Sequence, residues 1–173
     1  MMRLVSMVAL CALLASCGGW RTQDRGGWQP FPRSQISRAQ ASPVAAPAAP
    51  LSPASARQAL NAFRAENGLG PVSTNPQLEK AAQSHARDMA RSGIFDHRGS
   101  DGSDPLVRVQ RAGYSACYVS ENIARGQRSL SEVMVAWANS PGHRRNMLSD
   151  SASEFALVRG AGDNWVMVLG RSC

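Results

Sequence analysis

The sequence predicts an α+β domain over residues 55–173, and three observations support this fold class. The first half of this region carries apolar residues at helical spacing, most clearly Leu78, Ala81, Ala82, Ala86 and Met89. Near the C-terminus, two strand-like runs at 155–158 and 165–169 flank a turn of glycine and polar residues. Apolar residues make up 43% of the 173-residue chain, enough for the core of one ordinary domain.

Two helices are expected at the start of this domain. The first covers residues 56–66 and ends at Asn67-Gly68, a pair typical of a helix stop. The second begins after Asn75, a favoured N-cap residue, with Pro76 in the first helical position. Gly93 marks the end of this second helix.

Shorter elements follow, separated by glycine- and proline-rich breaks. Turn formers dominate the segment that comes after Gly93, which predicts a loop. In chain order we expect a loop at 94–104, a short helix at 104–113, an extended segment at 114–123, a helix capped by Ser129, a helical turn at 143–148, and the terminal hairpin.

The N-terminus predicts an export signal followed by a tether. Residues 1–16 combine Arg3 with an apolar stretch shorter than the roughly 20 residues that span a bilayer, the pattern of a cleaved signal peptide. The sequence LASC ending at Cys17 resembles a bacterial lipobox, so Cys17 is the expected lipidation site and membrane anchor. An ordinary signal peptide beside a cysteine is the alternative. Residues 17–54, rich in alanine and proline, are expected to form a semi-extended tether.

The net charge of +7 does not predict a nucleic-acid-binding protein. From residue 55 onward the chain carries 14 basic and 11 acidic side chains, a net charge of +3. These charges form no basic run, and no aromatic residues alternate with arginines as they do on single-strand-binding surfaces. We therefore expect no nucleic-acid partner.

The four cysteines divide by position. Cys11 leaves with the signal peptide and Cys17 carries lipid, so Cys117 and Cys173 remain in an oxidising compartment. Even parity predicts that these two form a disulfide. Two free thiols, one of them catalytic, are the alternative, although no neighbour of Cys117 is placed to lower its pKa.

Four motifs carry a family resemblance. They are the helical run LEKAAQSHARDMA at 78–90, FDH with DGS at 95–103, ENIARG at 121–126, and WANSPGHR at 137–144. In this order they resemble the elements of the CAP superfamily, which includes cysteine-rich secretory, antigen 5 and pathogenesis-related proteins. The resemblance implies that residues 55–173 form a CAP, or SCP-like, domain. It also implies a three-layer α-β-α sandwich with a small central antiparallel sheet, in which residues 114–123 join the terminal hairpin.

The resemblance further implies an open cleft lined by two histidines and two glutamates. His97, Glu121 and His143 match three of them, whereas the second glutamate falls near Ser140. Two imidazoles and a carboxylate are a ligand set for a divalent metal, zinc or calcium, so His97, His143 and Glu121 are candidate metal ligands. Their separations of 24 and 22 residues are not those of a local ligand motif, so the convergence rests on the family.

The same residues have structural interpretations. Glu121 and the histidines are equally suited to a hydrogen-bonded network that holds loops together. Glu132 is a substitute for the missing carboxylate, but Ser129 and Glu132 also form a capping-box pattern. His85 lies on the apolar stripe of the second helix, which predicts a core histidine with one hydrogen-bonded nitrogen.

Three hypotheses about function follow. The first is a non-enzymatic binding module, secreted and lipid-anchored in the cell envelope (in the outer membrane if the organism has one), whose ligand is a divalent metal, a lipid, a protein or a cell-wall component. The second is a metal-assisted hydrolase that uses the same cleft, although the sequence contains neither HExxH nor GxSxG. The third is a structural envelope protein with an inert cleft.

Overall fold

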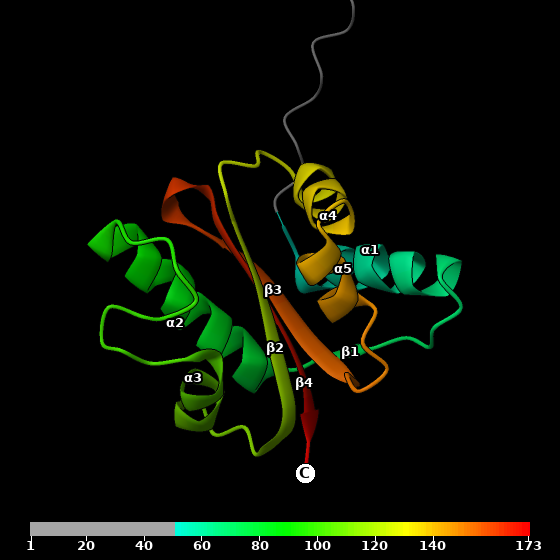
Figure 1. Cartoon of the computed structure of the whole chain (residues 1–173), viewed down its shortest axis with the longest axis horizontal. Helices are drawn as coiled ribbons and strands as arrows, with labels where there is room; N and C mark the ends of the chain where they lie inside the picture. Colours follow the sequence, from blue (N-terminus) through cyan, green and yellow to red (C-terminus); the bar gives the residue numbers. More distant parts are fainter. Residues whose placement is uncertain (1–50) are drawn as a thin grey trace, which may run out of the picture. The chain divides into compact units, whose positions relative to one another are not determined.

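The computed structural model describes residues 51–173, and Figure 1 shows the path of the chain. The predicted signal peptide, Cys17 and nearly all of the predicted tether lie outside the described residues. The elements, in chain order, are α1 (Pro53–Glu66), β1 (Ser73–Thr74), α2 (Pro76–Ser92), α3 (Pro105–Arg111), β2 (Ala116–Arg125), α4 (Leu130–Ala138), α5 (Pro141–Met147), β3 (Glu154–Gly160), a 3₁₀ turn (Ala161–Asp163) and β4 (Asn164–Ser172).

The strands form one sheet in the order β1-β3-β4-β2. β3 and β4 form the predicted hairpin, and β2 pairs antiparallel with β4 as the extended segment at 114–123 predicted. Strand β1 was not predicted: its two residues pair parallel with β3, and a segment so short carries no alternation to read. The α+β class and the central antiparallel strands are therefore confirmed.

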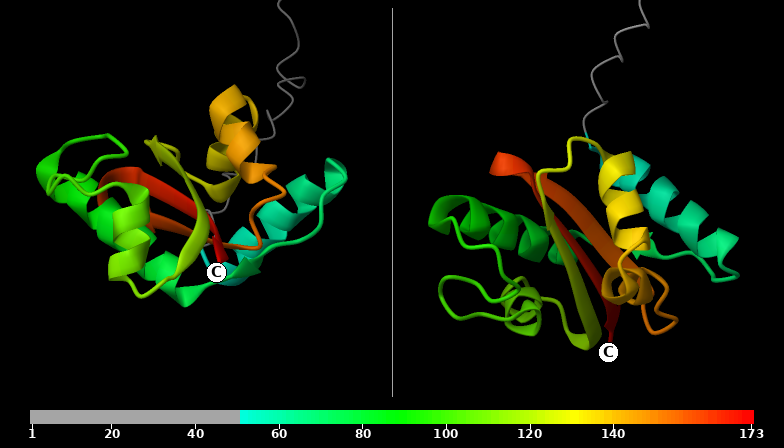
Figure 2. Two further views of the ribbon diagram at one scale, coloured as in Figure 1. Left: turned by 60° about the horizontal axis from the view of Figure 1, so that its bottom comes forward. Right: turned by 45° about the horizontal axis from the view of Figure 1, so that its top comes forward.

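Helices cover both faces of this sheet (Figure 2). Helices α1, α4 and α5 pack against one face, and α2 and α3 pack against the other. Along β3 and β4, alternate side chains enter opposite cores, so Phe155 joins the first core and Ala156 the second. Because both faces are buried, the strand sequences read as continuous apolar runs rather than as an alternation.

Helix boundaries differ from the prediction at two starts. Helix α1 begins at Pro53, three residues before the predicted start and inside the predicted tether. The side chains of Ser52 and Ser55 form a reciprocal capping box there, a pattern that the alanine- and proline-rich composition concealed. Helix α5 begins at Pro141, two residues early, because proline is well suited to the first turn of a helix.

Helix α2 has the boundaries that the sequence predicted. The side-chain oxygen of Asn75 accepts hydrogen bonds from the amides of Gln77 and Leu78. At the other end, Gly93 adopts a left-handed conformation with φ of 75°. This helix positions the loop at 93–104, which carries part of the candidate site.

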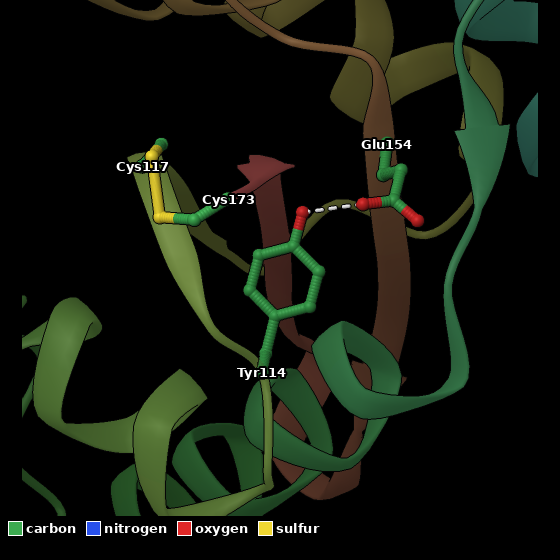
Figure 3. Close-up of a disulfide and its surroundings, with 4 residues drawn as sticks. All are labelled: Tyr114, Cys117, Glu154 and Cys173. Atoms are coloured by element: carbon green, nitrogen blue, oxygen red, sulfur yellow. Dashed lines mark hydrogen bonds between the residues drawn. A yellow bond between two sulfur atoms is a disulfide. The ribbon is translucent and has the colours of Figure 1, made fainter.

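The disulfide between Cys117 and Cys173 confirms the predicted pairing (Figure 3). It joins the start of β2 to the C-terminus, with the two Cα atoms 5.0 Å apart. Beside it, the hydroxyl of Tyr114 donates a 2.5 Å hydrogen bond to the carboxylate of Glu154 on β3. Together these links fasten the segment that enters β2 to the rest of the sheet.

Within residues 51–173, none of the helices combines the length and the apolar character that crossing a membrane requires.

Candidate functional site

The carboxylate of Glu121 is the centre of the candidate site. Its side chain is only 1% exposed, on the face of β2 that α2 and α3 cover. One oxygen, Oε1, accepts a 2.9 Å hydrogen bond from Nδ1 of His97. The other, Oε2, accepts a 2.8 Å hydrogen bond from Nη2 of Arg108, which forms a buried ion pair. Both oxygens of this buried acid are therefore engaged.

Arg108 is a residue of the site that sequence reasoning missed. It lies on α3, and its side chain is 6% exposed. Besides Glu121, its guanidinium donates hydrogen bonds of 2.8 Å and 2.9 Å to the backbone carbonyls of Ser103 and His97. Nothing in the short segment around Arg108 distinguishes it from the many exposed arginines of the chain, so the pairing became visible only in the fold.

The loop at 93–104 holds His97 at the surface, with half of its side chain exposed. Asp88 on α2 supports this loop by accepting hydrogen bonds from the amide and hydroxyl of Ser100, and these bonds lower the pKa of Asp88. The hydrogen bond from His97 to Glu121 raises the pKa of His97 above its usual value, outweighing the opposite effect of burial. His97 is thus the histidine that most readily becomes charged.

His85 lies on the inner side of the same carboxylate. It is 1% exposed, as a core position predicts, and its Nε2 is 3.7 Å from Oε1 of Glu121. The prediction of one hydrogen-bonded nitrogen is wrong, because neither ring nitrogen has a hydrogen-bond partner among residues 51–173. Burial, and less strongly the charge of Arg108, lower the pKa of His85, which favours the neutral imidazole, while the charge of Glu121 acts in the opposite direction.

His143 lies on α5, in the layer on the opposite face of the sheet from His97 and Glu121. Its ring packs at 52° to Trp137, with the ring centroids 6.3 Å apart. Burial, and secondly the charge of His97, lower the pKa of His143. No hydrogen bond or ion pair among the described residues joins His143 to Glu121.

Backbone contacts connect His143 to the strand that carries Glu121. Asn122 donates a 3.0 Å hydrogen bond to the carbonyl of His143. Asn146 donates to the carbonyl of Glu121 and to the side chain of Asn122, at 3.2 Å and 2.8 Å. The α5 layer is therefore held against β2 by amide side chains.

The two remaining candidates, Ser140 and Glu132, lie at the N-termini of helices α5 and α4. Ser140 precedes α5 as its N-cap residue but makes no side-chain capping bond. Glu132 lies in the first turn of α4, where its amide donates to Ser129 Oγ. Its carboxylate accepts a 2.8 Å hydrogen bond from the amide of Arg128, one residue before the expected cap amide. Glu132 therefore caps α4 rather than replacing the missing second glutamate.

The described residues do not present a ready-made metal centre. Within 51–173, no group of three or more histidine, cysteine, aspartate or glutamate side chains is arranged to hold a metal ion. The reason is visible at Glu121, whose oxygens are occupied by His97 and Arg108. A metal at this surface would have to displace one of these bonds, and metal binding stays a prediction.

Comparison with known proteins agrees with the four motifs and the fold. The profile of the cysteine-rich secretory protein family, CAP, matches residues 57–168, well over half of the chain. The chain belongs to this family. The matched residues begin within α1 and end within β4.

Individual relatives resemble parts of this chain. An uncharacterised protein of Bacillus subtilis, YkwD, is 38% identical over 97 residues, which are 56% of this chain but only 38% of that protein. An extracellular SCP-domain protein of Bacillus anthracis superposes with a TM-score of 0.64 at 22% identity, covering 71% of this chain and 45% of that one. An outer surface protein of Borrelia burgdorferi gives a TM-score of 0.64 at 22% identity, covering 68% and 90%. These structures share the fold of the CAP domain.

Proposed function

We propose that this chain is a secreted, non-catalytic binding module. It is held at the cell envelope by lipid on Cys17 and contacts its ligand through the surface around His97 and His143, with Ser140 at its margin. The signal-peptide and lipobox patterns support export and anchoring. The extracellular protein of B. anthracis and the outer surface protein of B. burgdorferi, which share the fold, are in keeping with such a location.

The observation that carries this proposal is the state of Glu121. A general base needs a free lone pair within reach of a substrate, and a catalytic metal needs open ligands. Glu121 is buried, its two oxygens accept hydrogen bonds from His97 and Arg108, and it is paired with a cation. With both oxygens engaged, the carboxylate holds His97 and the surrounding loop in position. The ligand then contacts the exposed edge of the His97 ring.

Among the described residues, neither Ser140 nor Cys117 is paired with a base that could activate it as a nucleophile, which also favours a non-catalytic module. Ser140 has no hydrogen bond to an imidazole, and Cys117 is consumed by the disulfide. A hydrolase of the serine or cysteine type requires the nucleophile and its base within hydrogen-bond reach. Recognition of an envelope component requires only the exposed polar surface.

The test combines binding and activity measurements on the purified full chain. We expect the chain to co-sediment with peptidoglycan sacculi or with vesicles of phosphatidylglycerol and phosphatidylethanolamine. For a protein ligand, we expect a discrete adduct in cells when a photo-cross-linking residue replaces Arg98. Retention should fall at least tenfold in the His97→Ala/His143→Ala variant. It should be unchanged in Arg57→Ala, which removes an exposed charge from α1, a helix that carries neither histidine.

Activity is measured with esterase, peptidase and phosphatase substrates, with and without zinc. We expect no turnover above the level of the Glu121→Gln variant. Turnover that Glu121→Gln abolishes would establish the hydrolase instead. Failure of both retention and cross-linking would leave an inert structural domain. Calorimetry with Zn²⁺ alone, on the wild type and the double-histidine variant, decides the metal prediction.

A further inference from the structure

A second polar site is lined by residues of α2, α3 and the loop that connects these two helices, which lie side by side in Figure 1. It is a pocket of about 250 Å³, and neither His97, Glu121 nor His143 lines it. Helix α2 contributes one face to its wall, at positions 80, 81, 84, 85, 88 and 91. Arg111 and Arg108 come from α3, and serine hydroxyls come from the loop.

Positive charge predominates in this pocket. The lining residues comprise two acids, Asp88 and Asp101, and four cations, Lys80, Arg91, Arg108 and Arg111, a net charge of +2. Glu121, which lies behind Arg108, reduces the local balance to +1.

The acids in the pocket are already engaged, whereas two of the cations are not. Asp88 accepts hydrogen bonds from Ser100, and Asp101 accepts from Arg111. Lys80 and Arg91 are exposed at the rim, and neither makes an ion pair or side-chain hydrogen bond with any of residues 51–173. The pocket therefore offers free cationic groups and no free carboxylate, which favours an anion over a metal.

His85 forms part of the inner wall of the same pocket. Its two ring nitrogens are buried without a hydrogen bond to any of residues 51–173, and leaving such a group unsatisfied costs free energy. Since one nitrogen of a neutral imidazole carries a proton, the ring has a donor that makes no hydrogen bond with the described residues, although the backbone of Asp96 and Oε1 of Glu121 lie close to the ring. This orphaned donor beside free cations is what distinguishes the pocket from an ordinary solvated basic face.

We propose that this pocket binds a small phosphorylated molecule. Arginine and lysine side chains are the usual protein partners of phosphate, and Ser84 adds a hydroxyl donor at the pocket wall. A phosphate group carries roughly −1.5 to −2 charges at pH 7, which matches the excess of cations. The volume is below the roughly 300–1,000 Å³ of sites for drug-sized ligands, so it suits a ligand of the size of glycerol phosphate.

The phosphate has two chemical sources, free inorganic phosphate and a phosphate ester of an envelope component. Calorimetry on the full chain at about 0.15 M ionic strength, where exposed charges are screened beyond roughly 8 Å, uses inorganic phosphate and glycerol 3-phosphate as separate probes. Tighter binding of glycerol 3-phosphate assigns the site to an ester, and equal binding assigns it to free phosphate. Absence of binding by both probes overturns the proposal.

Two double variants test whether phosphate binds in this pocket. Lys80→Ala/Arg91→Ala should weaken binding at least tenfold, and because both side chains are exposed, the fold should be retained. The matched control is Arg57→Ala/Arg145→Ala, which removes the same charge from α1 and α5 and should change affinity less than twofold. Equal losses in both variants would show non-specific attraction and reject the pocket.

NMR spectroscopy of the histidine side chains tests whether phosphate binds next to His85, which lines the pocket. The chain contains three histidines, so the imidazole signals of His85, His97 and His143 can be assigned individually. Phosphate should move the His85 signal most, and an effect confined to His97 and His143 would contradict the proposal. Neither His97 nor His143 lines the pocket, so the Lys80→Ala/Arg91→Ala variant tests it separately from the proposed envelope-binding surface.

Discussion

At the residue scale, the pairing of Glu121 with Arg108 determines what the site can do. A buried carboxylate without a countercharge would be neutralised or would bind a metal, whereas one paired with a guanidinium remains a fixed acceptor. His97 then serves as the group that faces outward. The chemistry of the site thus depends on Arg108, which no motif identified.

Replacing Glu121 tests this pairing. Glu121→Gln leaves Arg108 buried without a countercharge, and breaking a buried pair in this way typically costs about 3–5 kcal/mol of unfolding free energy. Urea denaturation of the full chain measures the loss. The control is Asp101→Asn, which breaks the exposed ion pair with Arg111 and should change stability far less. Equal losses in the two variants would show that Glu121 and Arg108 do not form a buried pair in solution.

The histidines should titrate in a defined order. The pKa of His97 is raised and the pKa of His143 is lowered, so His97 should protonate at a higher pH than His143. Because the pKa of His97 rises on folding, its bond to Glu121 contributes stability fully below pH of about 6.5, and this contribution is lost as the pH rises through the folded pKa. For His143 the sign is opposite, since stability falls as the pH drops below its unfolded pKa.

NMR titration of the imidazoles separates these opposing effects. In Glu121→Gln the pKa of His97 should fall, because the charged acceptor is gone. In His97→Gln the pKa of His143 should rise slightly, since the charge of His97 is only the second cause of its shift. A higher pKa for His143 than for His97 in the wild type would contradict the structure.

At the scale of elements, helix α2 links the two sites. Its inner face packs on the sheet through Leu78, Ala82 and Met89, and its flank carries His85 and Asp88 toward the loop and the pocket. Helix α2 comes close to β3 at Gly160, where an added Cβ would lie 2.9 Å from the Cβ of Ala86. The small residues at this contact therefore determine how closely α2 packs against the sheet.

Gly160→Ala should consequently push α2 away from β3. Overpacking of this kind typically costs about 1–3 kcal/mol, and urea denaturation would detect it. The matched control is Gly142→Ala on α5, where an added Cβ meets no atom within 4 Å. That change should be neutral or stabilise by about 0.4–1 kcal/mol, because alanine restricts the unfolded chain. If Gly160→Ala were as harmless as the control, α2 would have more room than the structure gives it.

At the scale of the whole molecule, long-range contacts join α1 to the segment around the end of α5, and the C-terminus to β2. Arg64, near the end of α1, donates hydrogen bonds to the carbonyls of Gly70, Met147 and Ser149. The disulfide joins Cys173 to the start of β2, across a sequence separation of 56 residues. Both links restrict the layer that carries His143 and the strand that carries Glu121.

Removing the disulfide should therefore destabilise the domain strongly. Loop-closure entropy for this separation corresponds to about 4 kcal/mol on the chain-entropy model. Cys117→Ala/Cys173→Ala should lose close to this amount in urea denaturation. Mass spectrometry of the unreduced wild type should find neither Cys117 nor Cys173 alkylated, and two alkylatable thiols at these positions would exclude the bridge.

Anchoring is tested by Cys17→Ala, a change outside the described residues. If Cys17 is the lipidation site, this variant should not incorporate labelled palmitate and should not fractionate with membranes. Normal processing and membrane retention of Cys17→Ala would instead establish an ordinary secretory signal.

Local patterns in the sequence were sufficient to predict the α+β class, the helix ends at Asn75 and Gly93, the terminal hairpin and the Cys117–Cys173 pair. The helix ends and the hairpin depend on residues close together in the chain, and the disulfide was predicted because an even number of cysteines remains after residue 17. The sequence alone is therefore enough to predict them. The tertiary structure alone decided that Arg108 neutralises Glu121, that His143 lies across the sheet, that His85 lacks a partner, and that α2 and α3 enclose a basic pocket. Those relations join residues far apart in the chain, and only the packing of α2, α3 and α5 around β2 determines which of them meet.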